Sequence, residues 1–387
     1  MDDLERLLGP DRRWQGDWLQ LCVGAIALLV VIGLAVLWPR SIPDFQLAEV
    51  GFADAVVPAE VSSATEGECS YAPEFSCLFV VFELTDGSDV SASQEFDISA
   101  TSPRLETGDR VVLNVINDAD PRFRYQYADR DRRGLLALVG IGFALAVVVL
   151  GRLRGVAALG GLLASVGILL WFVAPAILAG RDPVAVAAIG GGAIALVALY
   201  LAHGWRTTTH IAALGTFAAL GLTMLLSWLV TPAAAFSGFA SEEALFLSIL
   251  EGVRTSGLVL AGAILGAIGA LDDVTVTQVS TVYELRAANP GQTARQLYQS
   301  GLRVGRDHIA STINTLLLAY AGASMPLLLL LTLSNLSISL AANSEVVAVE
   351  IVRTIVGSIG LIAAVPITTL IAARTAVRPA TRRHRRS

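Results

Sequence analysis

The chain lacks lysine entirely, and all 27 of its basic residues are arginine. Without lysine no P-loop of the form GxxxxGK[ST] can occur, and neither a GxSxG nucleophile elbow nor an HExxH zinc motif is present. These absences exclude an ATPase or a hydrolase that carries one of these motifs. We therefore expect neither an enzyme nor a cofactor. The only strong basic cluster is the short tail 374–387, which argues against a nucleic-acid partner.

Charge of either sign is scarce as well. Of the 387 residues only 16% are charged, 54% are hydrophobic, and the mean hydropathy is +0.65. Together with long apolar runs, these values predict a polytopic α-helical membrane protein, because a membrane helix needs about 20 mostly apolar residues. We predict eight transmembrane helices at 18–38, 134–150, 156–180, 183–201, 211–230, 244–271, 309–333 and 346–373.

Arginines in the short loops predict the orientation, since they collect on the cytoplasmic side. They precede the first span and follow the second, fourth, sixth and eighth, whereas the alternate loops are poor in arginine. Both termini, 1–17 and 374–387, are therefore expected in the cytoplasm, and the region 39–133 outside it. His203 and His210 flank Arg206 in a short cytoplasmic loop and are expected at the surface.

The region 39–133 reads as a small extracytoplasmic β domain, either OB-like or another small barrel. Strands are expected at 79–84, 90–98 and 111–116, the first two around the turn signal Asp86-Gly87-Ser88. Cys69 and Cys77 lie in this region, and no further cysteine or histidine is near to complete a metal site. We expect them to form a disulfide in an oxidising compartment.

Two pairs of polar motifs recur along the helical part. His210-Ile211-Ala212 and Glu251-Gly252-Val253-Arg254-Thr255 are followed by His308-Ile309-Ala310 and Glu350-Ile351-Val352-Arg353-Thr354. The Glu and Arg residues match at one common offset of 99 positions. This predicts, within the seven-helix domain 134–373, an internal repeat of two parallel helical hairpins, 207–271 and 305–373.

The ionisable residues of these hairpins form the candidate transport or coupling site, because charges inside membrane helices are costly and often functional. Asp272 and Asp273 are expected at the cytoplasmic end of the sixth span, and at most one of them can face inward. Asp307 and His308 begin the seventh span at the same membrane face, and Asn314 continues it inward. An alternative is that all of them are solvated helix ends, and whether they hold a metal stays open.

Two further pairs, Glu251/Arg254 and Glu350/Arg353, each share one helix face because their members are three positions apart. They are candidates for an outer site. The alternative is an ion pair in the headgroup zone, since each apolar stretch is longer than the hydrocarbon core.

Three stretches resemble the YibE/F family of bacterial multi-pass membrane proteins. They are Glu251-Gly-Val-Arg-Thr-Ser-Gly, Gly269-Ala-Leu-Asp-Asp-Val-Thr-Val-Thr-Gln and Gly305-Arg-Asp-His-Ile-Ala-Ser-Thr-Ile-Asn-Thr-Leu-Leu-Leu-Ala-Tyr-Ala-Gly. The resemblance covers about residue 133 to the C-terminus, together with the arrangement of a first span and an outer β domain. It implies a protein of the bacterial plasma membrane, often described as a permease, with no assigned substrate.

Two hypotheses follow. The first is a permease that moves a small solute, ion or lipid without ATP, with protons coupled through the intramembrane Asp, His and Glu residues. The second is an envelope scaffold or assembly factor that acts through its outer β domain and does not transport. The expected partners are the lipid bilayer, the unknown substrate, and either an envelope protein or further copies of the chain.

Overall fold

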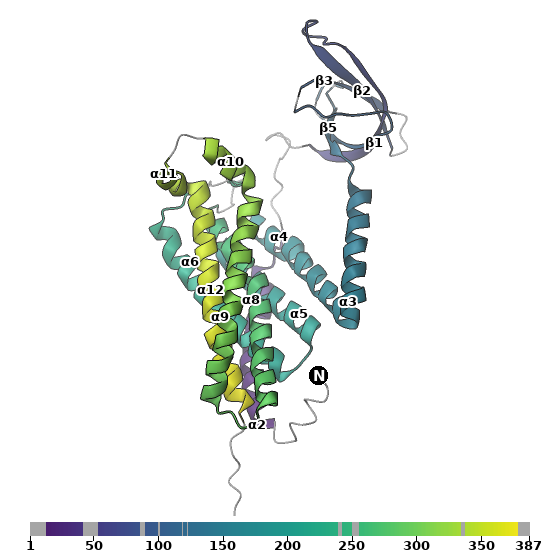
Figure 1. Cartoon of the computed structure of the whole chain (residues 1–387). Coiled ribbons are helices and arrows are strands. Elements are labelled where there is room, and N and C mark those ends of the chain that lie inside the picture. The colour runs from purple at the N-terminus through teal and green to yellow at the C-terminus, as the bar shows by residue number, and fades with distance from the viewer. Residues whose placement is uncertain are drawn as a thin grey trace, which may run out of the picture. The chain divides into compact units, whose positions relative to one another are not determined.

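The computed structural model describes residues 13–41, 53–85, 90–99, 101–117, 119–121, 123–238, 242–249, 255–333 and 337–377. The chain divides into two compact units (Figure 1). One unit is helical and contains residues 1–43 and 147–387, and the other, residues 44–146, contains a β-sheet. The predicted turn at residues 86–88 lies outside the described residues.

The β unit is a five-stranded antiparallel sheet in the order β3-β2-β1-β4-β5. The strands are β1 (Ala55–Glu68), β2 (Ser76–Leu84), β3 (Ser91–Asp97), β4 (Arg110–Val115) and β5 (Tyr125–Arg130). Strand β1 is long enough to pair with both β2 and β4, and a register shift between Val61 and Ser63 lets it bend from one to the other. The strands predicted around residues 79–84, 90–98 and 111–116 are confirmed.

The two edge strands of this sheet approach each other. The side-chain oxygen of Gln94 on β3 accepts a hydrogen bond of 2.7 Å from the backbone N–H of Tyr127 on β5, and Phe96 packs edge-on against the Tyr127 ring. The sheet thus curls into a small, partly open barrel, the architecture that OB-folds share. Its interior is apolar, with Val61, Phe82 and Leu113 almost completely buried.

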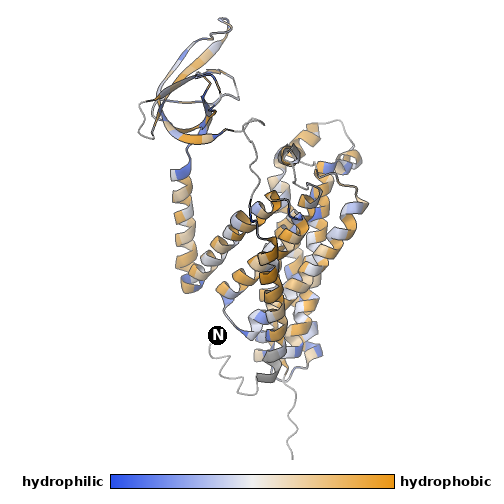
Figure 2. Cartoon of the chain, turned by 180° about the vertical axis from the view of Figure 1, so that it is seen from behind, coloured by the Kyte–Doolittle hydropathy of each residue, from blue (hydrophilic) through white to orange (hydrophobic). Residues whose placement is uncertain are grey.

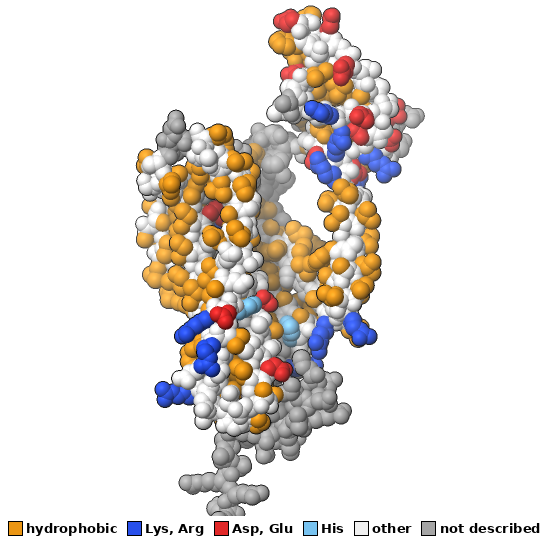
Figure 3. All heavy atoms as spheres, viewed as in Figure 1, with side chains coloured by type: hydrophobic (Ala, Val, Ile, Leu, Met, Phe, Trp, Pro, Cys, Tyr) orange, Lys and Arg blue, Asp and Glu red, His pale blue; other side chains and the backbone are white. Residues whose placement is uncertain are grey.

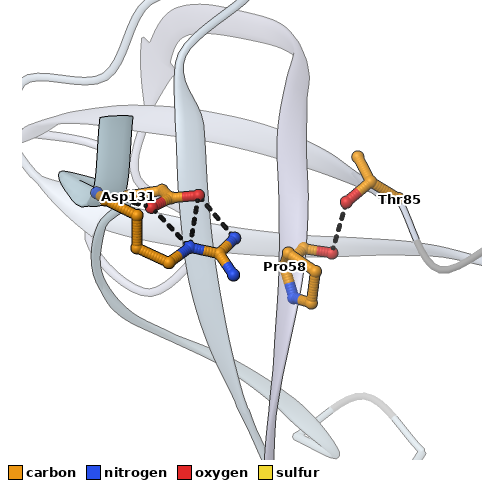
Figure 4. Close-up of polar contacts among 4 residues, drawn as sticks. Pro58, Thr85 and Asp131 are labelled. Carbon is orange, nitrogen blue, oxygen red and sulfur yellow. Dashed lines mark hydrogen bonds and ion pairs between the residues drawn. The ribbon is translucent and has the colours of Figure 1, made fainter. Parts of the chain in front are cut away.

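Short polar contacts lie at the ends of two barrel strands (Figure 4). The Thr85 hydroxyl, just after β2, donates to the carbonyl of Pro58 on β1 at 3.1 Å. Asp131, just after β5, accepts hydrogen bonds of 2.6–3.0 Å from the guanidinium of Arg133. These bonds lower the pKa of the Asp131 carboxyl to about 2.

The helical unit is apolar along most of its helices, as the orange ribbons of Figure 2 show. Six of the described helices are long and apolar enough to cross a membrane, or seven if one bent pair counts as a single span. The fold class is therefore a mostly helical protein with a small β domain and about six candidate spans, and the eight spans expected from the sequence stay a prediction. The helices are α2 (Arg13–Leu37), α3 (Arg133–Ile168), η3 (Leu169–Val173), α4 (Ala174–Leu178), α5 (Pro183–His203), α6 (Thr207–Ala233), α7 (Glu242–Ile249), α8 (Ser256–Ala288), α9 (Ala294–Ala323), α10 (Met325–Leu333), α11 (Ile338–Asn343) and α12 (Glu345–Ala376).

The centre of the helical unit is formed by α8 and α12, which pack against each other, while α6 and α9 each contact both. Ile264 and Leu271 of α8 and Leu361 of α12 are completely buried there. Small residues let the backbones approach closely. A Cβ atom on Gly215 of α6, for example, would lie only 2.0 Å from the Thr368 hydroxyl of α12.

Several helices extend beyond the spans predicted from the sequence. The helix predicted to end at Leu271 continues to Ala288, because Val274, Val279 and Val282 keep an apolar stripe buried through the following hydroxyl-rich run. The helix that contains the span predicted from residue 309 begins at Ala294, where Thr293 forms a capping box. It also bends by 69° between α9 and α10.

The second and third predicted spans lie in a single assigned helix, α3. Arg152 has non-helical backbone angles, with φ 52° and ψ −133°, so two helical stretches meet there. The sixth predicted span is likewise not one helix, because α7 and α8 are separate elements within the described residues.

Candidate functional site

Asp272 is the central residue of the candidate site. It lies about 24 Å from the first residue of α8, a helix of 33 residues, and so in the middle of a candidate span; its expected place at the cytoplasmic end of a span stays a prediction. Its side chain is mostly buried, and Leu271 and Val274 of the same helix are almost completely buried, whereas the adjacent Asp273 is exposed. Among the described residues, no arginine or histidine lies within ion-pair distance of its carboxyl group.

Two buried threonines contact Asp272. The Thr216 hydroxyl of α6 lies 3.5 Å from Oδ1 of Asp272 and 2.9 Å from the Thr275 hydroxyl, which is also 3.2 Å from the backbone oxygen of Asp272. Both threonines are fully buried. With a protonated carboxyl, Asp272 donates to Thr216, Thr216 to Thr275, and Thr275 to the backbone oxygen. With an ionised carboxyl, Thr275 donates to Thr216 and Thr216 to Asp272. The hydroxyls can therefore satisfy either protonation state by rotating.

Further buried hydroxyls extend this polar region along α6. Thr209, Thr216 and Thr223 recur at every seventh position and so share one helix face, and all three are buried. Thr368 of α12 is also fully buried, and its hydroxyl has no hydrogen-bond partner. Unpaired buried hydroxyls are costly. We call Thr209, Thr216, Thr223, Thr275 and Thr368 the hydroxyl seam.

The other carboxylate of the Asp-Asp pair points away from this seam. Asp273 is 73% exposed, and its Oδ2 lies 3.8 Å from Nε2 of His308 on α9. Asp307 and Asn314 are exposed on α9. Figure 3 shows acidic, basic and histidine side chains among apolar ones in the lower half of the helical unit. The four-residue cytoplasmic cluster predicted from the sequence is therefore divided: Asp272 faces the interior, whereas Asp273, His308 and Asp307 lie at or near the surface.

The second candidate pair lies near the start of α12. Nη1 of Arg353 lies 2.8 Å from Oε1 of Glu350, and both side chains are about one quarter to one third exposed. The pair is thus neither fully buried nor free in solvent. The matching pair of the first hairpin, Glu251 and Arg254, lies outside the described residues.

Sequence reasoning missed Thr216, Thr275 and Gln278 and misplaced His210. Thr216 and Thr275 look like ordinary small helix residues, although the seven-residue spacing on α6 was a usable signal. His210, expected at the surface, is 1% exposed, and its Nδ1 lies 2.6 Å from the Tyr200 hydroxyl. Gln278 is buried too and donates from Nε2 to the carbonyl of Gly301 on α9 at 2.7 Å.

The predicted disulfide is present in the β unit. Cys69 and Cys77 are bonded and buried, with Cα atoms 4.9 Å apart. The loop that they close is held to β3, because the Glu95 carboxylate accepts bonds of 2.7 Å and 2.5 Å from the backbone and hydroxyl of Ser70. Among the described residues, the one cluster of three possible metal ligands is this pair with Asp97. Since the two sulfurs are bonded to each other, the cluster does not form a metal site.

The fold and the site together define a class of protein. It is a multi-helix protein of membrane type, with a polar seam between its central helices and a small barrel. The sequence matches the family described as YibE/F-like protein over residues 139–378, which is more than half of the chain. The chain belongs to this family. The match begins within α3, includes every later helix to α12, and leaves out α2 and the barrel. No curated protein and no solved structure matches the chain.

Proposed function

We propose that the protein is an ATP-independent membrane permease in which a proton on Asp272 couples to movement of the substrate. The observation that carries the proposal is an aspartate in the middle of an apolar helix without a cationic partner among the described residues. An ionised carboxylate there is costly, so its charge must be neutralised by a proton or a bound cation. A group that needs a proton in one state and can release it in another is the minimal device for proton coupling.

The packing of the helices supports a duplicated hairpin. The central pair α8 and α12 occupies equivalent positions in the two proposed repeats, and so do α6 and α9, which flank it. The short helices α7 and α11 precede α8 and α12 in the same way. Permeases commonly place their site between such repeats, and the hydroxyl seam lies between α6, α8 and α12.

The proposal includes eight spans in the bacterial plasma membrane, with both termini in the cytoplasm. The non-helical residue Arg152 would divide α3 into two spans, and the bent pair α9–α10 would form one. The arginine distribution supports this orientation. The Cys69–Cys77 disulfide supports an oxidising compartment for the barrel.

Cysteine accessibility tests whether the seam is hydrated. Only Cys22, which is exposed on α2, needs replacement, since Cys69 and Cys77 are bonded to each other. Single cysteines would replace Thr216, Thr223 and Thr275 in a Cys22→Ser chain. They would be treated with a charged thiol reagent in intact cells and in inverted vesicles.

If the protein is a permease, the reagent should label these cysteines, and either the membrane side from which it reaches them or the rate of labelling should change with pH. No labelling at any of them, with a cysteine at exposed Leu317 of α9 as the control for lipid-facing positions, would mean a dry core. That result would refute the permease and favour the scaffold that acts through its β domain.

A further inference from the structure

A cavity of about 590 Å³ lies at the end of the helical unit where α12 begins. Its size is within the range of small-molecule sites. Five helices and the segment after α6 contribute to its wall. The apolar part of the wall includes Leu247, Leu258, Val259, Leu327, Val346 and Val349.

Glu350 and Arg353 are the only charged residues among those that line the cavity in the described part of the chain. Arg353 uses Nη1 to bind Glu350. Its Nε is buried and has no hydrogen-bond partner. A guanidinium has five N–H donors, and an unmet buried donor costs roughly 1–3 kcal/mol. The buried Nε packs near Gly262 of α8, so what the cavity offers is the exposed part of the guanidinium, which has donors beyond the one that Glu350 uses.

Two helix N-termini border this cavity, and Glu345 in the first turn of α12 partly offsets the positive end of that helix. Leu258 and Val259 belong to the first turn of α8, and Val346 and Val349 to the first turns of α12. The N-terminal end of a helix carries a partial positive charge, which favours anions. The cavity also meets the C-terminal end of α9, whose opposite partial charge is offset by the first turn of α10.

We infer that this cavity binds an amphiphile with a single acidic headgroup, carboxylate or phosphate, and an apolar chain. The headgroup accepts from the free donors of Arg353, and the chain packs against the apolar wall. That this amphiphile is the substrate class of the permease rests on the proposed function. That the cavity binds it does not. The acidic amphiphile could be a lipid of the bilayer or a free fatty acid.

Equilibrium binding of radiolabelled oleate to the full chain tests the inference, in nanodiscs of phosphatidylcholine at a fixed pH and without a gradient. Arg353→Gln should weaken binding at least about tenfold, because a charge-assisted hydrogen bond is lost. Glu350→Gln should tighten it several-fold, since it removes a competing acceptor and a repelling charge. Arg303→Gln, outside the cavity on α9, should change nothing.

Val346→Trp should abolish binding by filling the cavity, and folding should survive because Val346 is 39% exposed. Its matched control is Ile351→Trp, at a 40% exposed position of the same helix that does not line the cavity. Displacement by phosphatidylglycerol would identify a bilayer lipid as the source. No displacement would identify the free acid.

Oleate binding that is absent, that is unchanged by Arg353→Gln and Val346→Trp, or that dodecylamine displaces equally well would overturn the inference. The oleate assay measures binding at the cavity, and the hydration of the hydroxyl seam is measured separately by cysteine accessibility. A dry hydroxyl seam with intact, Arg353-dependent binding would therefore refute the permease alone, and a hydrated seam without oleate binding would refute this inference alone.

Discussion

The disulfide gives the sharpest stability prediction. Cys69 and Cys77 are separated by eight positions, so the bond closes a loop of about nine residues. In the chain-entropy account a loop of this size contributes about 2.5 kcal/mol to the folded state. This corresponds to about a 60-fold change in the folding equilibrium, since 1.4 kcal/mol is tenfold. The double variant Cys69→Ser/Cys77→Ser should lose this stabilisation.

Hydrogen exchange followed by mass spectrometry on the full chain in nanodiscs measures the loss. Amides of β1, β2 and β4 that exchange only on global opening of the barrel should lose up to about 60-fold in protection. Helical amides of α8 and α12 should be unaffected, because they belong to the other unit. Cys22→Ser is the control and should change neither. Unchanged barrel protection in the double variant would refute the reasoning.

Two packing predictions concern the helical unit. Gly215→Val should destabilise it by roughly 1–3 kcal/mol through overpacking. Gly221→Ala on the same helix should not, because an added Cβ there meets no atom within 4 Å. Thermal unfolding in detergent measures both variants, and equal melting temperatures would contradict the close α6–α12 contact. Gln278→Leu should lower the stability by about 1 kcal/mol, because its buried hydrogen bond to α9 is lost. Gln299→Leu, at an exposed position, should cost nothing measurable. The same thermal unfolding experiment compares the two variants, and identical melting temperatures would contradict the hydrogen bond.

Much of the fold was accessible from the sequence, because its strongest signals are simple. Apolar runs predict membrane-type helices, and the three predicted strands coincide with β2, β3 and β4. The cysteine pair was predictable from spacing and compartment. The family resemblance rested on residues that lie almost entirely within the matched range 139–378.

The helix ends were not predicted from the sequence, because charged residues were interpreted as helix ends. Asp272 and Asp273 suggested the end of a helix, yet α8 continues for four more turns since its next residues pack against α9 and α12. Asp307 and His308 suggested the start of a helix that in fact begins at Ala294. Tertiary packing, which a single sequence does not contain, decides the end of α8, whereas the start of α9 had a local signal in the capping box of Thr293 and Gln296.

The site was predicted in part for the same reason. Adjacent carboxylates were expected to diverge, but which of them faces inward depends on where α6 places Thr216. Glu350 and Arg353 were expected to share a face, and they do. The cavity beside them required α7, α8, α9 and α10 to converge, and no pattern in the sequence predicts that convergence.

The measurement that tests the central claim most directly is labelling with dicyclohexylcarbodiimide, which reacts with protonated carboxyl groups in apolar surroundings. Full-length protein in nanodiscs would be treated over a range of pH, and the modified carboxyl located by peptide mass spectrometry. The account predicts modification at Asp272 that decreases as pH rises, disappears in Asp272→Asn and persists in Asp273→Asn. No modification of Asp272 at any pH, or modification of Asp273 in its place, would contradict a proton-carrying carboxyl in the seam.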